Sequence, residues 1–230
     1  LIDEDGGHLS KTPQYSMKQN LVNTKSEIFL DHKGDGLGCI KMKHGGIYYV
    51  DYLGAMRLAP EEQKKWLYNK FSLPNYTINN YSFKTEFETT PIARVELDVD
   101  LRSYASVSNQ RFFVPVNLLS AIQHTPPRCR NRKNPFLLNF DRTSNDTLTI
   151  NLPEGYKVES SVPQTSCETE FGTYELNCSV KGNKIFCVRT MKAYRGLFPP
   201  EKYEDYFDFY QKIVRADNQK VIFIANDDKE

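Results

Sequence analysis

The sequence has no long apolar run and none of the common catalytic signatures. No stretch approaches the ~18 consecutive apolar residues that a membrane-spanning helix requires. The motifs GxSxG, HExxH and GxGxxG and the P-loop are all absent. The 5 cysteines and 4 histidines form no CxxC pair and no metal-ligand spacing. We therefore expect no membrane span, no catalytic residue, no metal ion and no cofactor.

An excess of charge of either sign is also missing. Lys and Arg number 30 against 29 Asp and Glu, so the net charge is +1. A dedicated nucleic-acid binder normally carries a clear basic excess, and we therefore expect no nucleic-acid partner. The apolar share is only 39%, yet 14 Tyr and 14 Phe are far too many for a disordered chain. Aromatic side chains at this density favour strands.

Alternation of apolar and charged residues predicts the clearest strand, at residues 91–102. Val95, Leu97, Val99 and Leu101 alternate there with charged side chains. This pattern is typical of a sheet with one face on the core and the other in water. Further strands are predicted at residues 26–30, 37–42, 76–88, 147–152, 168–180, 185–191 and 220–225.

Two covering helices are predicted, at residues 60–71 and 200–215. Each begins with proline and glutamate, which suit the first helical turn. In the second, Tyr203, Phe207 and Tyr210 recur at helical spacing and form one apolar face. Strands dominate and no βαβ alternation appears. The expected fold is therefore mostly β, an antiparallel β-sandwich with two short covering helices.

The length of 230 residues fits one domain or two small ones. Residues 1–21 are polar and rich in turn formers, which suggests a linker or the end of a preceding unit. We expect the β-sandwich module to span residues 22–230, with sub-halves 22–135 and 136–230. The chain opens without Met and without a signal peptide, so we expect it to be a fragment of a longer protein.

One pair of cysteines is expected to meet across a hairpin. Residues 180–185 read as a β-turn region centred on Gly182-Asn183, which sets Cys178 opposite Cys187. Counted outward from the turn, this is a non-hydrogen-bonded pair with Cα atoms ~4.5 Å apart. A disulfide tolerates that separation. Two small apolar residues packed side by side fit the same pattern, so both interpretations stay open.

Two other constellations have simpler explanations than chemistry. Residues 31–36 contain two aspartates and two glycines, but Lys33 occupies the third position of what would be a calcium loop, and no Glu stands at the twelfth. A hairpin turn explains the glycines better. Cys39 and His44 lie five residues apart on one predicted strand, which directs their side chains to opposite faces and argues against a catalytic dyad.

A basic loop at residues 128–133 is the main candidate binding site. The candidate binding residues are Arg128, Arg130, Arg132 and Lys133. Cys129 lies among them, and cationic neighbours lower the pKa of a thiol and raise its reactivity. A catalytic thiol would need a base, for which His124 is the nearest candidate in sequence. The alternative is a solvated loop between two strands, bracketed by prolines.

Several stretches resemble the region that follows the catalytic core in bacterial transglutaminase-like proteins. Residues 5–13 resemble the end of that core, and residues 58–67 resemble the helix behind it. Residues 152–158, 170–174 and 199–213 resemble the C-terminal half of the uncharacterised domain that follows. The resemblance implies an exported, periplasmic or extracellular protein. Its Cys-His-Asp triad would lie upstream of Leu1, and no catalytic position maps onto this chain.

These observations predict a non-catalytic accessory or interaction module. Its expected partner is the upstream core of the same polypeptide, or else a peptide or a glycan. The alternative is a polyanion- or glycan-binding module that uses the basic loop 128–133.

Overall fold

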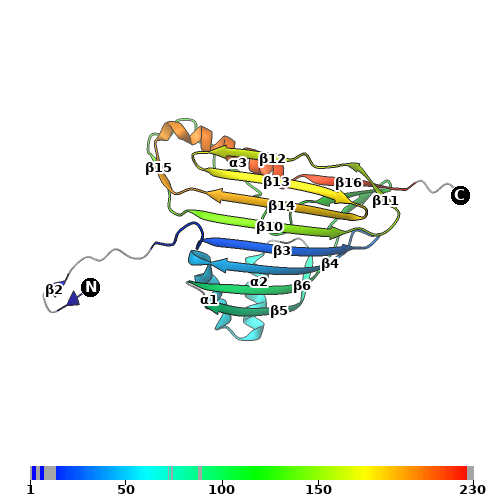
Figure 1. Ribbon diagram of the computed structural model, residues 1–230, viewed down its shortest axis with the longest axis horizontal. Helices are drawn as coiled ribbons and strands as arrows, with labels where there is room; N and C mark the ends of the chain where they lie inside the picture. The colour runs from blue at the N-terminus through cyan, green and yellow to red at the C-terminus, as the bar shows by residue number, and fades with distance from the viewer. Residues whose placement is uncertain are drawn as a thin grey trace.

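An eight-stranded sheet runs through the whole molecule (Figure 1). The computed structural model describes residues 2–3, 6–7, 14–71, 73, 75–87 and 90–226. All neighbouring strands are antiparallel except β10 and β3, which run parallel. In spatial order the strands are β12 (Thr165–Thr169), β13 (Gly172–Lys181), β14 (Lys184–Ala193), β10 (Arg142–Asn151), β3 (Leu21–Leu30), β4 (Gly36–Gly45), β6 (Pro91–Leu101) and β5 (Tyr76–Phe87).

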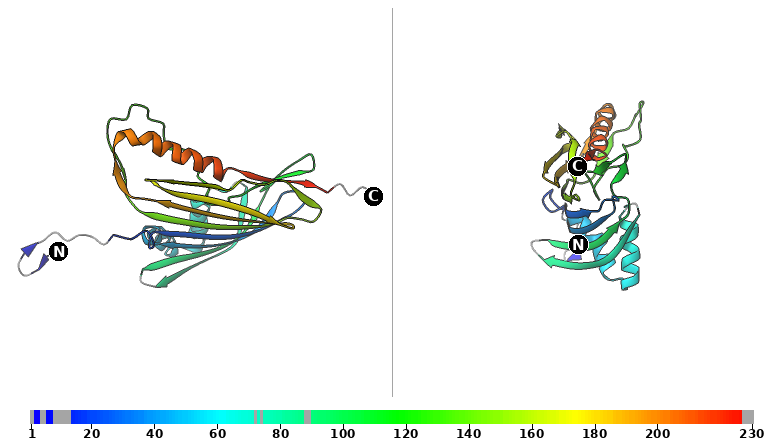
Figure 2. Two further views of the ribbon diagram at one scale, coloured as in Figure 1. Left: turned by 45° about the horizontal axis from the view of Figure 1, so that its top comes forward. Right: turned by 90° about the vertical axis from the view of Figure 1, so that its right-hand side faces the viewer.

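A second layer covers one face of this sheet and leaves the other face open (Figure 2). Part of this layer is a four-stranded sheet, ordered β11 (Tyr156–Ser160), β16 (Lys220–Ala225), β8 (Arg111–Pro115) and β7 (Ser106–Ser108). The helices are α1 (Tyr49–Met56), α2 (Pro60–Lys70) and α3 (Tyr203–Asp217), with 3-10 turns at Gly46–Tyr48 and Pro200–Lys202. Two small pairs complete the described elements: β9 (Phe136–Leu138) with β15 (Gly196–Phe198), and β1 (Ile2–Asp3) with β2 (Gly6–Gly7).

The core lies between the two layers, and strand alternation decides which side chains enter it. Val95, Leu97 and Val99 of β6 are buried, whereas Glu96 and Asp98 between them are exposed. The same alternation runs through β3, β4, β10 and β14. The inner face of the large sheet therefore carries the buried apolar residues, and its outer face carries mainly charged and polar ones, with Phe29, Leu37 and Val188 as exposed apolar exceptions.

The expectation of a mostly β, layered fold with covering helices is confirmed. The predicted helices at residues 60–71 and 200–215 correspond to α2 and to the 3-10 turn with α3, and the last strand is β16. The number of covering helices was wrong, because α1 was missed. Its residues Tyr49, Tyr52 and Ala55 are buried against the core.

The prediction of one strand at residues 168–180 was also wrong. The chain reverses between β12 and β13, which pair with each other. Gly172 permits this reversal, because a Cβ there would lie 2.0 Å from the Lys192 carbonyl oxygen. The large sheet takes strands from both sides of residue 135. Residues 8–13, which carry part of the family resemblance, lie outside the described residues.

A buried ionic network joins the two layers at Arg189 on β14. Its guanidinium donates two hydrogen bonds to Asp217 at the end of α3, at 2.7 and 3.0 Å, and one to Asp146 of β10 at 3.1 Å. Burial alone would lower the pKa of Arg189, but the hydrogen bonds and charges of Asp217 raise it overall. Asp217 also accepts from the Tyr174 hydroxyl, the Asn117 amide and the backbone N–H of Ile122.

Loss of Arg189 should be far more costly than loss of an exposed arginine in a similar pair. Arg189→Leu leaves two carboxylates without their cation, so the free energy of unfolding should fall by roughly 3–5 kcal/mol. The control is Arg111→Leu, which breaks a solvent-accessible two-bond pair with Glu159 and should lower the free energy of unfolding far less, because water screens the two charges. Urea unfolding of both variants tests this, and equal losses would contradict it.

Candidate functional site

The candidate catalytic pair Cys39 and His44 is divided between the two faces of the sheet. Cys39 lies half-buried on the outer face of β4, and His44 is buried on the inner face. Burial and the nearby Asp98 raise the pKa of the Cys39 thiol. Burial likewise raises the pKa of the Cys167 thiol. Nucleophilic thiols have lowered pKa values, so neither environment activates its cysteine.

His44 is a core residue whose ring stacks on Tyr52 of α1, with centroids 4.1 Å apart. Within the described part of the chain, neither the Nε2 atom of His44 nor the Tyr52 hydroxyl has a hydrogen-bond partner. Burial, with a smaller effect from Lys70, lowers the pKa of His44 to about 3. The unfolded chain therefore binds a proton here between about pH 6.5 and pH 3 that the folded chain does not.

This difference predicts an acid-sensitive core. Stability linked to His44 is complete above its ordinary pKa of 6.5 and is lost as the pH falls towards 3. Between pH 7 and pH 5 the free energy of unfolding should fall by about 2 kcal/mol. His44→Phe should remove that part of the pH dependence, and His124→Phe, at an exposed histidine, should not. Urea unfolding at the two pH values measures this change in the free energy of unfolding. If the His44→Phe variant lost as much stability between pH 7 and pH 5 as the unaltered protein, the prediction would be refuted.

The side chains of Asp31 and Asp35 stabilise the turn between β3 and β4 by accepting hydrogen bonds. The Asp31 carboxylate accepts hydrogen bonds from the backbone N–H groups of Lys33 and Asp35, at 2.8 and 3.0 Å. Asp35 accepts from the Ser103 N–H and from Arg102, and these two contacts lower its pKa. The described residues contain no group of three or more His, Cys, Asp or Glu side chains placed to hold a metal ion.

Cys178 and Cys187 face each other in the β13–β14 hairpin, in the predicted register. The structure joins their sulfur atoms in a disulfide, with the Cα atoms 4.2 Å apart. Cys39, Cys129 and Cys167 are free thiols.

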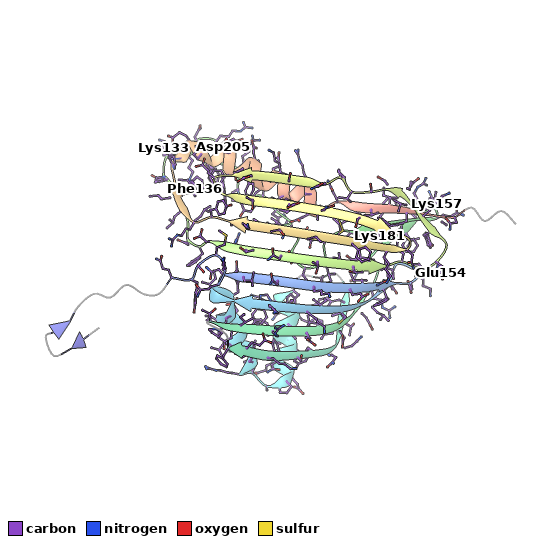
Figure 3. All side chains as sticks on the ribbon, in the orientation of Figure 1. Lys133, Phe136, Glu154, Lys157, Lys181 and Asp205 are labelled. Atoms are coloured by element: carbon purple, nitrogen blue, oxygen red, sulfur yellow. A yellow bond between two sulfur atoms is a disulfide. The ribbon has the colours of Figure 1, made fainter. Side chains whose placement is uncertain are left out.

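The basic loop 128–133 lies against the start of α3, with Lys133 and Asp205 at the same end of the molecule (Figure 3). The Arg128 guanidinium stacks over the Phe207 ring at 5.2 Å and pairs with Glu204 at 2.5 Å. Arg132 stacks over Tyr203 at 4.6 Å. The structure thus uses two of the four predicted binding residues to hold the loop on aromatic side chains, and leaves Arg130 and Lys133 exposed.

A second group of cations, which sequence reasoning missed, lies on the open face of the large sheet. We call it the open-face basic cluster: Lys25 of β3, Lys41 and Lys43 of β4, Lys84 of β5 and Arg94 of β6. Strand pairing sets like charges directly opposite each other, with Lys25 facing Lys41 and Arg94 facing both Lys43 and Lys84. Such pairs destabilise a sheet.

Relief of this repulsion should stabilise the protein. Lys25→Thr removes the cation opposite Lys41 and adds a good strand former, so the free energy of unfolding should rise by roughly 0.2–1 kcal/mol at low ionic strength. The gain should shrink as salt screens the charges. Lys192→Thr is a matched control on the same face, where Thr143 and Thr173 are the opposite residues. Urea titrations at two salt concentrations measure both variants; equal gains would contradict the repulsion.

An exposed apolar patch lies on the small β9–β15 sheet. Leu137 and Leu197 face each other directly and are 61% and 70% exposed. Their neighbours Phe136 and Phe198 are buried in the aromatic cluster beneath. Phe140, just after β9, is also exposed. We call Leu137, Leu197 and Phe140 the leucine patch.

Comparisons with known proteins show that part of the chain is similar to a family without an assigned function. Residues 110–223, just under half of the chain, match a family described as a domain of unknown function with solved-structure structure (DUF3858). No curated protein matches. A solved structure, described as a putative protease from Parabacteroides distasonis ATCC 8503, matches at 26% identity with a TM-score of 0.37. The match covers 43% of this chain and 19% of that one.

None of the helices in the described part of the chain has the length and apolar character to span a membrane.

Proposed function

We propose that this chain is a non-catalytic accessory module that packs against a neighbouring folded unit of the same polypeptide. The observation that carries the proposal is the leucine patch. Two leucines opposite each other, both more than half exposed, form a contiguous apolar surface on a short sheet whose other side is anchored in the core. Contiguous exposed apolar surface of this kind marks interaction sites.

The leading segment of the chain passes close to this patch. Arg195, next to β15, donates a hydrogen bond to the Gln14 side chain at 2.6 Å, and its backbone N–H donates to Asp141 at 3.0 Å. Gln14 and Phe140 line a common hollow of about 290 Å³. A unit that precedes residue 14 would therefore emerge beside the leucine patch. The sequence resemblance suggests a transglutaminase-like core as that unit.

The environments of Cys39 and Cys167, two of the three free thiols, support the non-catalytic part of the proposal. The raised pKa values of Cys39 and Cys167 disfavour the thiolate that a nucleophilic cysteine needs. His44 is a stacked core residue and faces away from Cys39. An exported location, periplasmic or extracellular, is supported by the Cys178–Cys187 bridge, because disulfides persist in oxidising compartments.

Substitution of the two leucines should separate docking from folding. Leu137→Lys/Leu197→Lys should barely change the melting temperature of the isolated chain, because both side chains are mostly in water. In the longer polypeptide, contact with the neighbour should raise the melting temperature of this module, and the double variant should abolish that rise. Differential scanning calorimetry measures both.

The matched control is Phe29→Lys/Leu37→Lys. These residues also face each other across two strands and are 52% and 62% exposed, but they lie on the open face of the large sheet. In the longer polypeptide, this control variant should still show the rise in the melting temperature of the module. A gene that encodes no further folded unit would overturn the proposal, and so would a module that melts identically alone and in the longer polypeptide. An amide- or ester-hydrolysing activity lost on replacing one free cysteine would overturn its non-catalytic part.

A further inference from the structure

The open-face basic cluster joins cations that lie far apart in the sequence into one surface. Lys84, Arg94 and Lys43 are successive cross-strand neighbours on β5, β6 and β4. Lys41 and Lys25 form the adjacent row on β4 and β3. Opposite side chains have Cβ atoms ~4.5–5.5 Å apart, so the five cations share one continuous area.

The carboxylates in this area do not balance the cations. Glu86 pairs with Arg94. The Lys41 amino group lies 3.7 Å from a carboxylate oxygen of Glu96, and both of these side chains are more than half exposed. Among the described residues no carboxylate oxygen lies within 4.0 Å of the Lys25 or Lys43 amino group. Of the five cations, only Arg94 and Lys41 form ion pairs among the described residues, and the charge left unpaired on the others is suited to an anionic ligand.

The cluster borders a hollow that offers neutral polar groups as well. The hollow measures about 480 Å³ and is lined by Lys25, Lys43, Arg94, Asn23 and Asn145, among others. The Asn145 amide donates to the Asn23 carbonyl oxygen at 2.9 Å. This bond leaves the Asn23 amide donors and the Asn145 carbonyl oxygen available to a ligand.

The register extends these groups into a transverse row. The row runs across six neighbouring strands through Lys84, Arg94, Lys43, Asn23, Asn145 and Thr190. At a strand spacing of ~4.8 Å it spans roughly 24 Å, cationic on one side and amide or hydroxyl on the other. Glu27 and Asp98, further along the strands on the same face, limit the positive area to one end. An extended ligand is therefore favoured to lie across the strands.

The lining distinguishes between classes of anion. None of the described residues that line the hollow is aromatic, so these residues offer no platform for stacked nucleobases or neutral sugar rings. Lysine and arginine bind carboxylate and sulfate groups, and asparagine and threonine donate to and accept from hydroxyls. We propose that the open-face basic cluster binds an acidic polysaccharide, a sugar chain that carries carboxylate or sulfate groups. This binding is separate from docking through the leucine patch.

Affinity electrophoresis through gels that contain polygalacturonate, dextran sulfate or neutral dextran tests the proposal. The two acidic polymers should retard the chain, neutral dextran should not, and added NaCl should weaken the retardation. Lys25→Ala/Lys43→Ala should reduce affinity roughly tenfold. This variant should stay folded, because it relieves repulsion, and its melting temperature checks this.

The matched control is Lys181→Ala/Lys184→Ala. It removes the same charge from the β13–β14 hairpin of the same sheet, and Lys181 lies at the end opposite Lys133 (Figure 3). Affinity should be unchanged. Leu137→Lys/Leu197→Lys should also bind normally, so docking and sugar binding can fail independently.

Several outcomes would overturn the assignment. Retardation by neutral dextran would show that charge is not the determinant. Loss of binding in Arg130→Ala/Lys133→Ala but not in Lys25→Ala/Lys43→Ala would move the site to the loop. Binding to vesicles of phosphatidylserine and phosphatidylcholine without binding to either acidic polysaccharide would assign the face to a membrane surface. Absence of retardation in every gel would remove the proposal.

Discussion

The Arg189 guanidinium lies where β14, β10, the end of α3 and the segment at residues 117–122 all meet. It is almost fully buried, and its two carboxylate partners come from different layers. A buried charge is tolerated only when every donor and acceptor around it is satisfied. This requirement fixes the end of α3, and with it the start of β16, against the inner face of the large sheet.

The second layer covers only the inner face of the large sheet, so the outer face stays open. Among the described residues, the fully buried large apolar side chains lie on the inner face of the large sheet or in the layer that covers it. That layer contains α1, α2, α3 and the four-stranded sheet. The side chains of the outer face therefore do not have to pack in the core. Its residues need only suit a strand in water, and Lys25 opposite Lys41 is a combination that stability alone does not favour.

Local patterns in the sequence predicted much of the fold. The alternation from Val95 to Leu101, the helical face from Tyr203 and the final strand each depend on neighbours within a few residues. The missed helix α1 had such a signal too, because Tyr49, Tyr52, Leu53 and Met56 follow helical spacing.

Long-range pairing was beyond these patterns. β3 and β10 pair in parallel across more than a hundred residues, and no short motif encodes that contact. The reversal at Gly172 was missed for a related reason, since the glycine is required by a carbonyl of β14 and not by its own neighbours. The candidate site on the open face joins two hairpins, β3–β4 and β5–β6, through the long-range pairing of β4 with β6. Without that pairing, the sequence pointed only to the contiguous run at residues 128–133.

The contrast between the two basic groups shows why a charge run is a weak guide to a binding site. In the loop, Arg128 and Arg132 are stacked on α3, and Glu204 neutralises the first. On the sheet, cations separated by up to 69 positions in the sequence are brought side by side. The strand register places more cations than carboxylates directly opposite these residues. The net charge of +1 is a sum over the whole chain. Attraction of an anion depends on the charges within about a Debye length. At the hollow on the open face, Lys25 and Lys43 form no ion pair with the described residues.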